Sequence, residues 1–426
     1  MTDFQTPRGT RDFLPKDALK RQIVLEKIRR IFELWGFDPL ETPAFEEWRL
    51  LAAKSGGGEA IREEVYYFKD KSERELGLRF DLTVPTARVV AINPNIPKPF
   101  KRYQIGNVWR YDRPGAGRYR EFTQADIDIF GSSMIDADAL VVGVACNCLY
   151  ELGFKDFIVR LNSRKLIEKI VLSIGVEQEK VIDIFRSIDK LEKIGEDGVR
   201  DELQKKGFEL SVIKNVLKLI SFNLDTLKSK GFIEDIQKLE DIVEKVKDFG
   251  YDNVKIDISL VRGLEYYTDS VFEVILPENK ALTITAGGRY DNLIEVYGGK
   301  STPAVGISLG IDRIIFVMEE RNMFNEKETN ARMFLVSIGD SSKVNRQVIR
   351  LSSLLRKIGI PNEYDIMSRS LSKQLDYINT KNIPYAIIVG EKELDRNVVK
   401  LKDMKSGEEQ ELSIAGFEKE IGKLVD

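Results

Sequence analysis

Apolar residues recur at two spacings along the chain, and the change of spacing divides it into zones. In residues 1–165, helical spacing predicts helices over 17–35 and 138–152, with strand and turn patterns between them. Residues 166–248 keep helical spacing almost throughout and are rich in Lys, Glu, Ile and Leu. This pattern predicts a helical insertion with very little strand.

Extended patterns return after the helical zone. Alternating apolar residues predict strands over 254–260, 271–276 and 282–286, so we expect the sheet of the first zone to resume there. A polar stretch at 325–330 is suited to a linker. Beyond it the pattern predicts, in chain order, a strand over 333–338, a helix over 343–358, a strand over 362–365, a helix over 371–381 and a strand over 385–389.

We therefore expect three domains in an α/β protein. A single core stops growing at roughly 250–300 residues, and this chain has 426. The expected domains are a core made of 1–165 and 249–325, a helical insertion over 166–248, and a C-terminal domain over 330–426. Because strands alternate with helices in the last of these, it is predicted to be α/β with a partly parallel sheet.

A hairpin between 103 and 131 carries the most informative polar pattern. Side chains of a strand alternate between its faces, and the odd positions from 125 to 129 are apolar. The even positions are mainly polar or aromatic: Arg118, Arg120, Phe122, Gln124, Asp126, Asp128 and Phe130. Charges on a solvated hairpin can simply protect a sheet edge. A ring, an amide and a carboxylate aligned opposite an apolar face favour the floor of a pocket.

Other polar blocks accompany the hairpin. Arg79, Asp81 and Thr83 alternate before Pro85 and would share one face of an extended segment. Three blocks combine glycines with charged or phenolic residues: 260–267 (LVRGLEYY), 286–291 (AGGRYD) and 306–313 (GISLGIDR). The glycine pair of the second block permits close approach of the backbone to a ligand. Each block alone could be structural, but together they offer arginines, tyrosines and carboxylates without a nucleophile.

The lack of histidine narrows the chemistry. With no His in the chain, an imidazole base, a Ser/His pair and a His-ligated metal are excluded. Two cysteines, Cys146 and Cys148, cannot build a thiolate zinc site and are expected to be core thiols. No metal site made by His or Cys is therefore predicted. Phosphoryl and nucleotidyl transfer suit the remaining groups, because Arg and Mg²⁺ neutralise charge without a titrating base.

Net charge and hydropathy limit which partners and which cellular location are expected. The formal net charge is −3 and the sequence pI is near 5.7, so a nucleic acid would need a local basic surface. No signal peptide and no apolar run of membrane-spanning length are present, and cysteines are few. These features predict a cytoplasmic protein with no membrane partner.

Several of these blocks resemble the histidyl-tRNA synthetase family of class II aminoacyl-tRNA synthetases. The stretch 110–131 resembles the second signature motif of class II, and 306–313 resembles the third. Three blocks are more selective for the histidine-specific family: 8–13 (RGTRDF), 260–267 and 286–291. The stretch 78–85 is similar to the archaeal and eukaryotic form. The resemblance covers nearly the whole chain.

The resemblance implies both a fold and a function. The fold would be a class II catalytic core with a mixed, largely antiparallel sheet, a helical insertion and a C-terminal anticodon-binding domain. The function would be that of a histidine–tRNA ligase, which activates L-histidine with ATP to histidyl-adenylate and passes the histidyl group to tRNA(His). Mg²⁺ would accompany ATP, and the first signature motif usually builds a homodimer.

The resemblance also implies roles at the ATP subsite. Arg110 would hold the α-phosphate, while Phe122 and Arg313 would sandwich the adenine. Arg118 would take the outer phosphates, with Arg113 as a second candidate. The ATP-binding set carried over is Arg110, Asp112, Arg118, Phe122 and Arg313. Arg262 would lie beside the α-phosphate opposite Arg110, where related synthetases use a further metal ion, so these two arginines are the expected catalytic charges.

The histidine subsite can be argued from chemistry beside the family. A neutral imidazole has one donor and one acceptor nitrogen, so it needs a carboxylate on one side and a donor on the other, roles that Asp128 and Tyr267 suit. The substrate's ammonium group needs acceptors, for which Asp81, Thr83 and Gln124 are suited. The full expected set is Asp81, Thr83, Gln124, Asp128, Arg262, Tyr266, Tyr267 and Tyr290. Arg289 is expected to line the same cavity.

The chain departs from the family's common bacterial form in two places. Asp81, Asp128 and Asp312 stand where that form has glutamates, so their reach is shorter by one methylene. A closer backbone or a bridging water would compensate. The hairpin tip at Gly115 and Ala116 lacks the larger polar residues often present there, which argues against a side-chain contact from this tip to the tRNA acceptor end.

Three alternatives remain open. A regulatory paralogue of the synthetase would keep the catalytic fold without tRNA charging, although it typically lacks the terminal domain and degrades the block around Arg262, and both are intact here. A synthetase for another amino acid would lose the block 262–267. A non-catalytic RNA-binding or signalling module would not require arginines that clamp phosphates.

Overall fold

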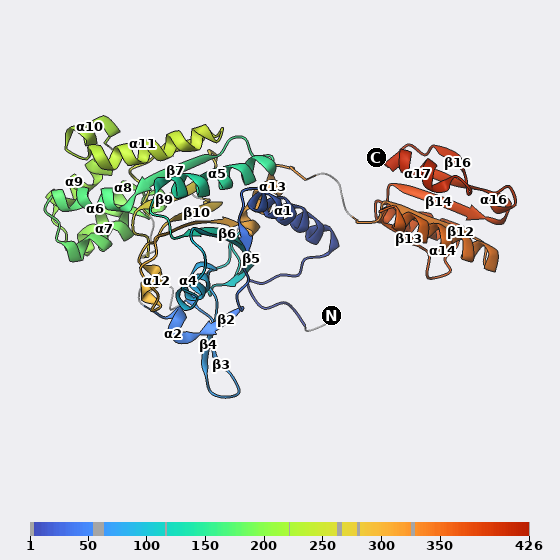
Figure 1. Cartoon of the computed structure of the whole chain (residues 1–426), viewed down its shortest axis with the longest axis horizontal. Helices are drawn as coiled ribbons and strands as arrows, with labels where there is room; N and C mark the ends of the chain where they lie inside the picture. Colours follow the sequence, from blue (N-terminus) through green and yellow to red (C-terminus); the bar gives the residue numbers. More distant parts are fainter. Residues whose placement is uncertain are drawn as a thin grey trace. The chain divides into compact units, whose positions relative to one another are not determined.

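The chain forms two compact units (Figure 1). The computed structural model describes seven stretches: 4–53, 64–115, 117–220, 222–261, 266–278, 282–324 and 329–425. The first unit extends to Met323, and the second begins at Phe324 and also includes Asp12–Ile23. No helix within the described stretches is long and apolar enough to cross a bilayer.

An eight-stranded sheet forms the centre of the first unit. Its strands, in sheet order, are β1 (Asp38–Pro39), β5 (Phe100–Trp109), β6 (Glu121–Phe130), β11 (Ala304–Gly310), β10 (Thr285–Arg289), β9 (Ser270–Ile275), β7 (Ile158–Ser163) and β8 (Val254–Ile256). Neighbours are antiparallel except at the two edges, where β1 and β5, and β7 and β8, run parallel. Strands from both sides of the helical zone share this mixed sheet, as predicted.

β5 and β6 form the predicted hairpin. Its register pairs Phe100 with Phe130 and Trp109 with Glu121. The apolar odd positions of β6 are buried, and so is its polar face, where Asp126 and Asp128 are each 2% exposed. The polar face is therefore a buried floor. The alternation does not extend to Arg118 and Arg120, because β6 begins only at Glu121.

Two predicted strands are corrected by the structure. The strand expected over 254–260 ends at Ile256, because the Asp257 carboxylate accepts hydrogen bonds from the backbone N and the Oγ of Ser259 at 2.9 and 2.6 Å. These bonds close a turn. The strand expected over 282–286 is β10, which begins at Thr285 and continues to Arg289. The glycine pair thus lies inside a central strand and not at its end.

Further helices lie outside the stretch 164–248 and before Phe324. They are α1 (Pro15–Leu34), α2 (Trp48–Leu51), α4 (Thr83–Ile92), α5 (Ile135–Glu151), α12 (Leu293–Val296) and α13 (Ile311–Glu320). The helices α1 and α5 match the predictions over 17–35 and 138–152. α5 packs against β11 and β10. Its Cys146 and Cys148 are buried free thiols, as expected, and burial raises the pKa of Cys146 to about 12.

The zone 164–248 is helical and has no strand among its described residues, as predicted. Its helices are α6 (Arg164–Ser173), η1 (Gln178–Lys180), α7 (Val181–Ile188), α8 (Leu191–Lys205), α9 (Leu210–Ile220), α10 (Leu224–Ser229) and α11 (Ile233–Asp248). The last of them packs against α5, β7 and β8. Its buried stripe of Ile236, Leu239, Ile242 and Val246 has helical spacing and attaches this zone to the sheet.

A small antiparallel sheet precedes α4. Its strands, in sheet order, are β2 (Phe45–Glu47), β4 (Glu75–Leu78) and β3 (Tyr67–Lys69). Leu51 and Val65 form an apolar cluster with Phe80 and Val84. This cluster holds the turn from β4 into α4 in place, and that turn carries residues of the cavity described below.

The second unit has a five-stranded, partly parallel sheet with helices, which agrees with the predicted α/β class, although its last two strands were not predicted. Its strands, in sheet order, are β13 (Asn362–Tyr364), β12 (Met333–Ile338), β14 (Tyr385–Gly390), β15 (Val398–Asp403) and β16 (Glu409–Ser413). Its helices are α14 (Ser342–Lys357), α15 (Leu371–Thr380), α16 (Glu391–Asp395) and α17 (Phe417–Val425). β12 is parallel to both β13 and β14, whereas β15 and β16 are antiparallel. Two apolar clusters, each containing alternate residues of β12 and β14, give this unit its own core.

Candidate active site

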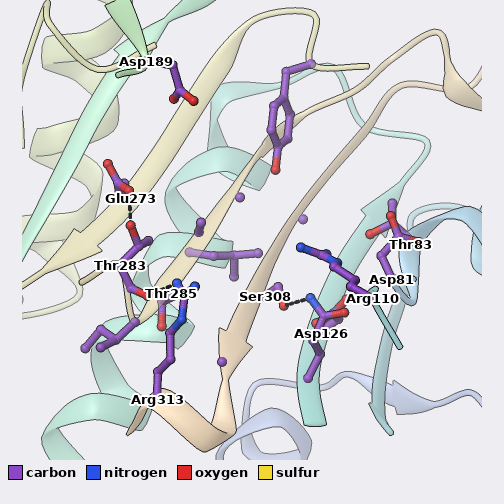
Figure 2. Close-up of a pocket in the computed structure, with 18 of the residues that line it drawn as sticks. Asp81, Thr83, Arg110, Asp126, Asp189, Glu273, Thr283, Thr285, Ser308 and Arg313 are labelled. Atoms are coloured by element: carbon purple, nitrogen blue, oxygen red, sulfur yellow. Dashed lines mark hydrogen bonds between the residues drawn. The ribbon is translucent and has the colours of Figure 1, made fainter. Parts of the chain in front are cut away.

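A cavity of about 580 Å³ lies in the first unit and is bordered by β6, β10 and β11. Of the two residue sets carried over for ATP and histidine, it brings together all but one: Asp81, Thr83, Arg110, Asp112, Arg118, Phe122, Gln124, Asp128, Tyr266, Tyr267, Tyr290 and Arg313. The exception, Arg262, lies outside the described residues. Arg113, the second candidate for the outer phosphates, is not among the lining residues. Figure 2 shows Arg313 with Thr283, Thr285 and Glu273 on one side of the cavity, and Arg110 with Asp81, Thr83, Asp126 and Ser308 on the other.

The hairpin supplies a cationic wall. Arg110 Nε donates to the Phe80 carbonyl at 2.9 Å, and its guanidinium carbon lies 5.3 Å from the centre of the Phe122 ring. Arg118 forms an ion pair with Asp112. Asp112 also accepts a hydrogen bond from the backbone N of Arg113 at 2.8 Å. The Asp112 carboxylate therefore orders the turn, and Arg110 and Arg118 line the cavity.

The passage from β11 into α13 supplies the opposite wall. Arg313 donates to the Thr283 carbonyl at 2.7 Å. Its neighbour Asp312 is buried, accepts from the backbone N of Thr123 at 2.7 Å and forms an ion pair with Arg11 at 2.6 Å. Arg11 also lies over the Tyr119 ring, 3.7 Å from its centre. Arg11 of the N-terminal block thus contacts both the hairpin and α13.

The segment 79–83 is not extended, so the predicted shared face is wrong. β4 ends at Leu78 and α4 begins at Thr83. Asp81 accepts a hydrogen bond from the backbone N of Val84 at 2.9 Å, which satisfies a free donor at the start of this helix. Arg79 instead donates to the Thr42 carbonyl at 2.6 Å and the Asn107 carbonyl at 2.9 Å. Asp81 and Thr83 line the cavity because the helix begins there.

Three buried carboxyls underlie the cavity. Burial raises the pKa of Asp81 to about 6 and that of Asp126 to about 7, and it also raises the pKa of Asp128. Arg102 on β5 is fully buried and pairs with Asp128, which holds the pKa of this carboxyl lower than burial alone would. Tyr290 donates its hydroxyl to Asp128 as well. Asp128 is therefore positioned from two strands.

The tyrosines form an aromatic corner beside these acids. The rings of Tyr266 and Tyr267 meet edge to face with centres 4.8 Å apart, and those of Tyr266 and Tyr290 lie 5.8 Å apart. Burial raises the pKa values of Tyr266 and Tyr290 well above the ordinary value. Their hydroxyls consequently stay protonated and can act as hydrogen-bond donors at neutral pH.

Glycines make close packing possible at this corner. A Cβ on Gly306 would lie 2.0 Å from Asp128 Oδ1, and one on Gly288 would lie 2.7 Å from Tyr267 Cδ1. A Cβ on Gly287 would lie 2.1 Å from the Gly306 carbonyl oxygen. Side chains at these positions would displace the acid or the ring, so the glycine pair of β10 serves contact within the protein.

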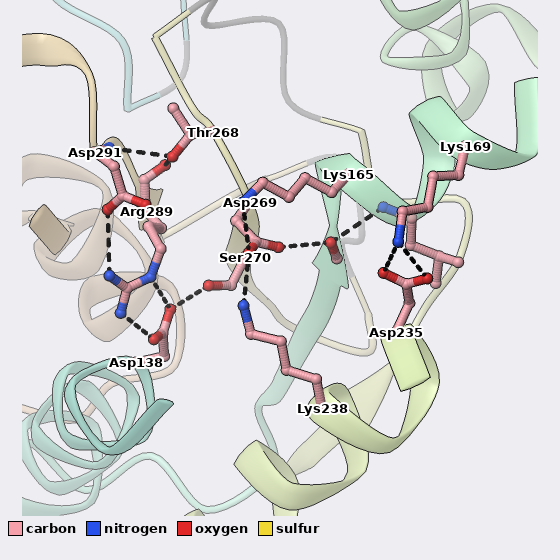
Figure 3. A network of polar contacts seen from close by, with 12 residues as sticks. Asp138, Lys165, Lys169, Asp235, Lys238, Thr268, Asp269, Ser270, Arg289 and Asp291 are labelled. Atoms are coloured by element: carbon pink, nitrogen blue, oxygen red, sulfur yellow. Dashed lines mark hydrogen bonds and ion pairs between the residues drawn. The ribbon is translucent and has the colours of Figure 1, made fainter. Parts of the chain in front are cut away.

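Arg289 does not line the cavity, contrary to expectation. It follows the glycine pair on the opposite side of β10 and is 2% exposed. It pairs with Asp138 of α5 and with Asp291 at 3.2 Å (Figure 3). It also donates to the Ser132 carbonyl at 2.9 Å. Ser270 also donates to Asp138. This network fixes β9 and β10 to α5, so Arg289 is structural.

Asp269 joins the tyrosine segment to the helical zone. It accepts hydrogen bonds from Ser163 Oγ at 2.7 Å and from Lys238 of α11 at 2.6 Å, and Lys165 lies at 3.5 Å (Figure 3). Its carbonyl accepts from the backbone N of Arg164 at 2.8 Å. These bonds lower the pKa of Asp269 despite burial, and they place Tyr266 and Tyr267 relative to α6 and α11.

Several cavity residues were missed from the sequence. Ser308 accepts a hydrogen bond from Gln124 at 2.8 Å, and Arg160 of β7 pairs with Asp257, Glu192 and Glu273. Strand alternation placed Asp126 on the polar floor but gave it no role. No local signal singles out Arg102 or Arg160, since both lie inside otherwise ordinary strands. Within the stretches described, no group of three or more acidic or thiol side chains is placed to hold a metal ion.

Family models and known relatives match the chain almost from end to end. A model described as histidyl-tRNA synthetase matches residues 9–314, and one described as an anticodon binding domain matches 332–424. The chain is 38% identical to the histidine–tRNA ligase of Pyrococcus furiosus over 96% of each chain. It is 41% identical to that of Korarchaeum cryptofilum over 93% of each. A crystal structure of histidyl-tRNA synthetase from Nostoc sp. PCC 7120 covers 100% of both chains, with 29% identity and a TM-score of 0.86.

Proposed function

Because the chain belongs to the histidyl-tRNA synthetase family, and is thus a class II, ATP-dependent histidine–tRNA ligase, we propose that its cavity holds ATP and L-histidine side by side. The observation that carries this proposal is the composition of the cavity. Arginines and a phenyl ring line it together with buried aspartates and tyrosines. The first group suits a nucleotide triphosphate, and the second suits an imidazole and an ammonium group.

The proposed roles follow from charge and hydrogen-bonding capacity. Arg110 and Arg262 neutralise the α-phosphate, Arg118 and Asp112 organise the outer phosphates, and Phe122 and Arg313 hold the adenine between them. For the amino acid, Asp128, Tyr267 and Tyr290 take the imidazole. The ammonium group is held by Asp81, Thr83 and Gln124, and Tyr266 packs against both other tyrosines. Support for these roles comes from the cavity lining and, for Arg262, from the family resemblance.

The chemistry needs no titrating base. The histidine carboxylate is ionised at neutral pH and attacks the α-phosphorus of ATP, so that histidyl-adenylate forms and pyrophosphate leaves. Fixed arginines stabilise the negative charge that builds up on the phosphate oxygens. In the second step the terminal ribose hydroxyl of tRNA(His) attacks the histidyl carbonyl and AMP leaves. A chain without histidine can carry out both steps.

We further propose that Mg²⁺ enters with ATP. A magnesium ion usually keeps several waters and takes phosphate oxygens with one or two carboxylates, so a cage made only of protein is not required. Glu64 and Asp112 line the cavity beside Arg118 and are the carboxylates available on that side. The ion would supply positive charge to the phosphates.

The remaining proposals concern the whole molecule. Residues 1–165 and 249–325 are proposed as the catalytic core, 166–248 as an inserted helical domain and 330–426 as the anticodon-binding domain for tRNA(His). A homodimer and a cytoplasmic location are proposed from the family and from the two free thiols. Sedimentation would test the dimer against the 48.7 kDa of one chain.

The decisive test is exchange of labelled pyrophosphate into ATP by the purified chain. We expect exchange that depends on histidine and is not supported by other amino acids, together with charging of tRNA(His). Arg110→Ala should abolish exchange because the α-phosphate loses its counter-charge, whereas Arg49→Ala, an exposed arginine of α2, should not. Exchange without charging would instead favour the regulatory paralogue, and absence of both would refute the proposal.

A further inference from the structure

The floor of the cavity contains two buried acceptor atoms that lack donors. Gln124 and Asp126 occupy alternate positions of β6, both line the cavity, and their exposures are 9% and 2%. Within the described part of the chain, neither Gln124 Oε1 nor Asp126 Oδ1 has a hydrogen-bond partner. Leaving a buried acceptor unpaired costs free energy, and such atoms in a cavity indicate where a ligand donates.

Ser308 connects these two side chains. It lies on β11 directly opposite Asp126, and β11 is the neighbour of β6 in the sheet. Gln124 Nε2 donates to Ser308 Oγ at 2.8 Å. Figure 2 shows Ser308 and Asp126 close together on the floor of the cavity. Ser308 also faces the Asp126 carboxyl across the two strands, and its hydrogen bond lowers the pKa of this acid against the larger effect of burial, as a donated hydroxyl proton would. An ionised carboxylate can only accept, so Asp126 sets the direction of both bonds.

We infer that Asp126 and Ser308 act as a relay that fixes the amide of Gln124 with its Oε1 toward the bound amino acid. This inference rests on the proposed function, in which Gln124 accepts from the substrate's ammonium group. With Nε2 held by Ser308, the free end of the amide is the acceptor. The opposite orientation would present N–H donors to an ammonium group, which has donors only. Asp126 and Ser308 are therefore positioning residues for histidine binding.

The relay depends on the charge of Asp126. This carboxyl faces Arg102 from β5, Asp128 on its own strand and Asp81 at the start of α4, and Arg79 acts on it from the end of β4. Burial is the largest influence and raises its pKa to about 7. A protonated Asp126 can donate to Ser308, which can then donate to Gln124 Oε1 and leave Nε2 toward the substrate. Histidine affinity is thus expected to fall as the pH drops below about 7.

Ser308→Ala and Asp126→Asn in the full-length chain test the relay. The assay is histidine-dependent pyrophosphate exchange between pH 6.5 and 8.5, with KM measured separately for histidine and ATP. At pH 8 we expect Ser308→Ala to raise the KM for histidine about tenfold, the effect of one charge-assisted hydrogen bond, and to leave the KM for ATP within about twofold. On lowering the pH, the histidine KM of the unmodified chain should rise more steeply than that of either variant.

The possible outcomes distinguish the relay from general damage to the cavity. The substrate's own imidazole titrates equally in all three proteins, so a difference in slope belongs to the chain. Parallel pH profiles, or a histidine KM within about twofold of the unmodified value in Ser308→Ala, would overturn the relay. Equal rises of both KM values would indicate general damage to the cavity and would overturn it too. An unmodified chain that shows no histidine-dependent exchange refutes the proposed function itself, which is a different result from a normal chain with unaffected variants.

Discussion

Asp128 illustrates how neighbouring side chains fix the position of a buried aspartate in the cavity. Its carboxylate is 2% exposed, and it is paired with Arg102 from β5 and with the Tyr290 hydroxyl at the end of β10. Gly306 on β11 leaves the space that the carboxylate occupies. The position of the carboxylate is therefore set by β5, by β11 and by the residue that follows β10, and this close packing leaves little room for a longer side chain.

At the same scale, the buried acids predict how stability depends on pH. Asp81 and Asp126 have pKa values of about 6 and about 7 in the native state, both raised by burial from an ordinary 3.8. Between about pH 4 and 7 the native state thus binds more protons than the unfolded chain, so stability falls as the pH rises. We expect the unliganded first unit to lose a few kcal/mol between pH 5 and 8.

Unfolding by denaturant at several pH values checks this prediction. All three tryptophans, Trp35, Trp48 and Trp109, belong to the first unit, so their fluorescence reports on that unit alone. Asp126→Asn removes the carboxyl whose pKa is raised to about 7 and should flatten the pH dependence. Stability that increases from pH 5 to pH 8 in the unmodified chain would contradict the assignment of raised pKa values.

At the scale of elements, the helical zone is attached at the position that carries the tyrosine pair. Asp269 is 4% exposed. It accepts hydrogen bonds from Ser163, which precedes α6, and from Lys238 of α11, and it forms a longer ion pair with Lys165. It stands two residues after Tyr267. Motion of α11 relative to β9 would therefore move the aromatic corner of the cavity.

Lys238→Ala tests this attachment. Its loss leaves a buried carboxylate without its main cationic partner, and we expect the first unit to be destabilised by about 1–3 kcal/mol, with the KM for histidine raised several-fold. Lys169→Ala is the matched control, because Lys169 pairs with Asp235 within the helical zone and its side chain is 56% exposed. That pair should contribute about 0–1 kcal/mol. Equal effects of the two substitutions on histidine binding would argue against the role of Asp269.

At the scale of the whole molecule, the second unit carries a separate cavity of about 380 Å³. Arg369 lies over the Tyr377 ring, 4.5 Å from its centre, and the adjacent Ile366 and Met367 are 84% and 66% exposed. Rings, guanidinium planes and exposed apolar side chains are the groups on which unstacked RNA bases pack. The family model for an anticodon binding domain spans this region.

Arg369→Ala should therefore separate the two activities. We expect the KM for tRNA(His) in the charging reaction to rise roughly five- to a hundredfold, the range for loss of one base-stacking contact, while histidine-dependent exchange is unchanged. Arg346→Ala, at an exposed position of α14, should leave both reactions unaffected. A fall in exchange with Arg369→Ala would show that the two units are not functionally separable in this way.

Much of the fold follows from local pattern. The helices α1 and α5, the hairpin β5–β6 and all the predicted elements of the second unit follow from the spacing of apolar residues along the chain. The predictions from local pattern were wrong where a hydrogen bond of one side chain fixed the end or the start of an element. The Asp257 turn cut one predicted strand short, and Asp81 at the start of α4 replaced an extended segment with a helix.

The sequence by itself determined the family, the polar floor of β6 and twelve of the residues that line the cavity, because these depend on residue types at short, regular spacings. Only the tertiary structure decided which distant side chains hold the cavity residues in position. Ser308 meets Gln124 across 184 residues, Arg289 turns away to Asp138, and Arg102 reaches Asp128 from the neighbouring strand. Such contacts depend on the order and register of strands, and buried charges are set by what that order places beside them.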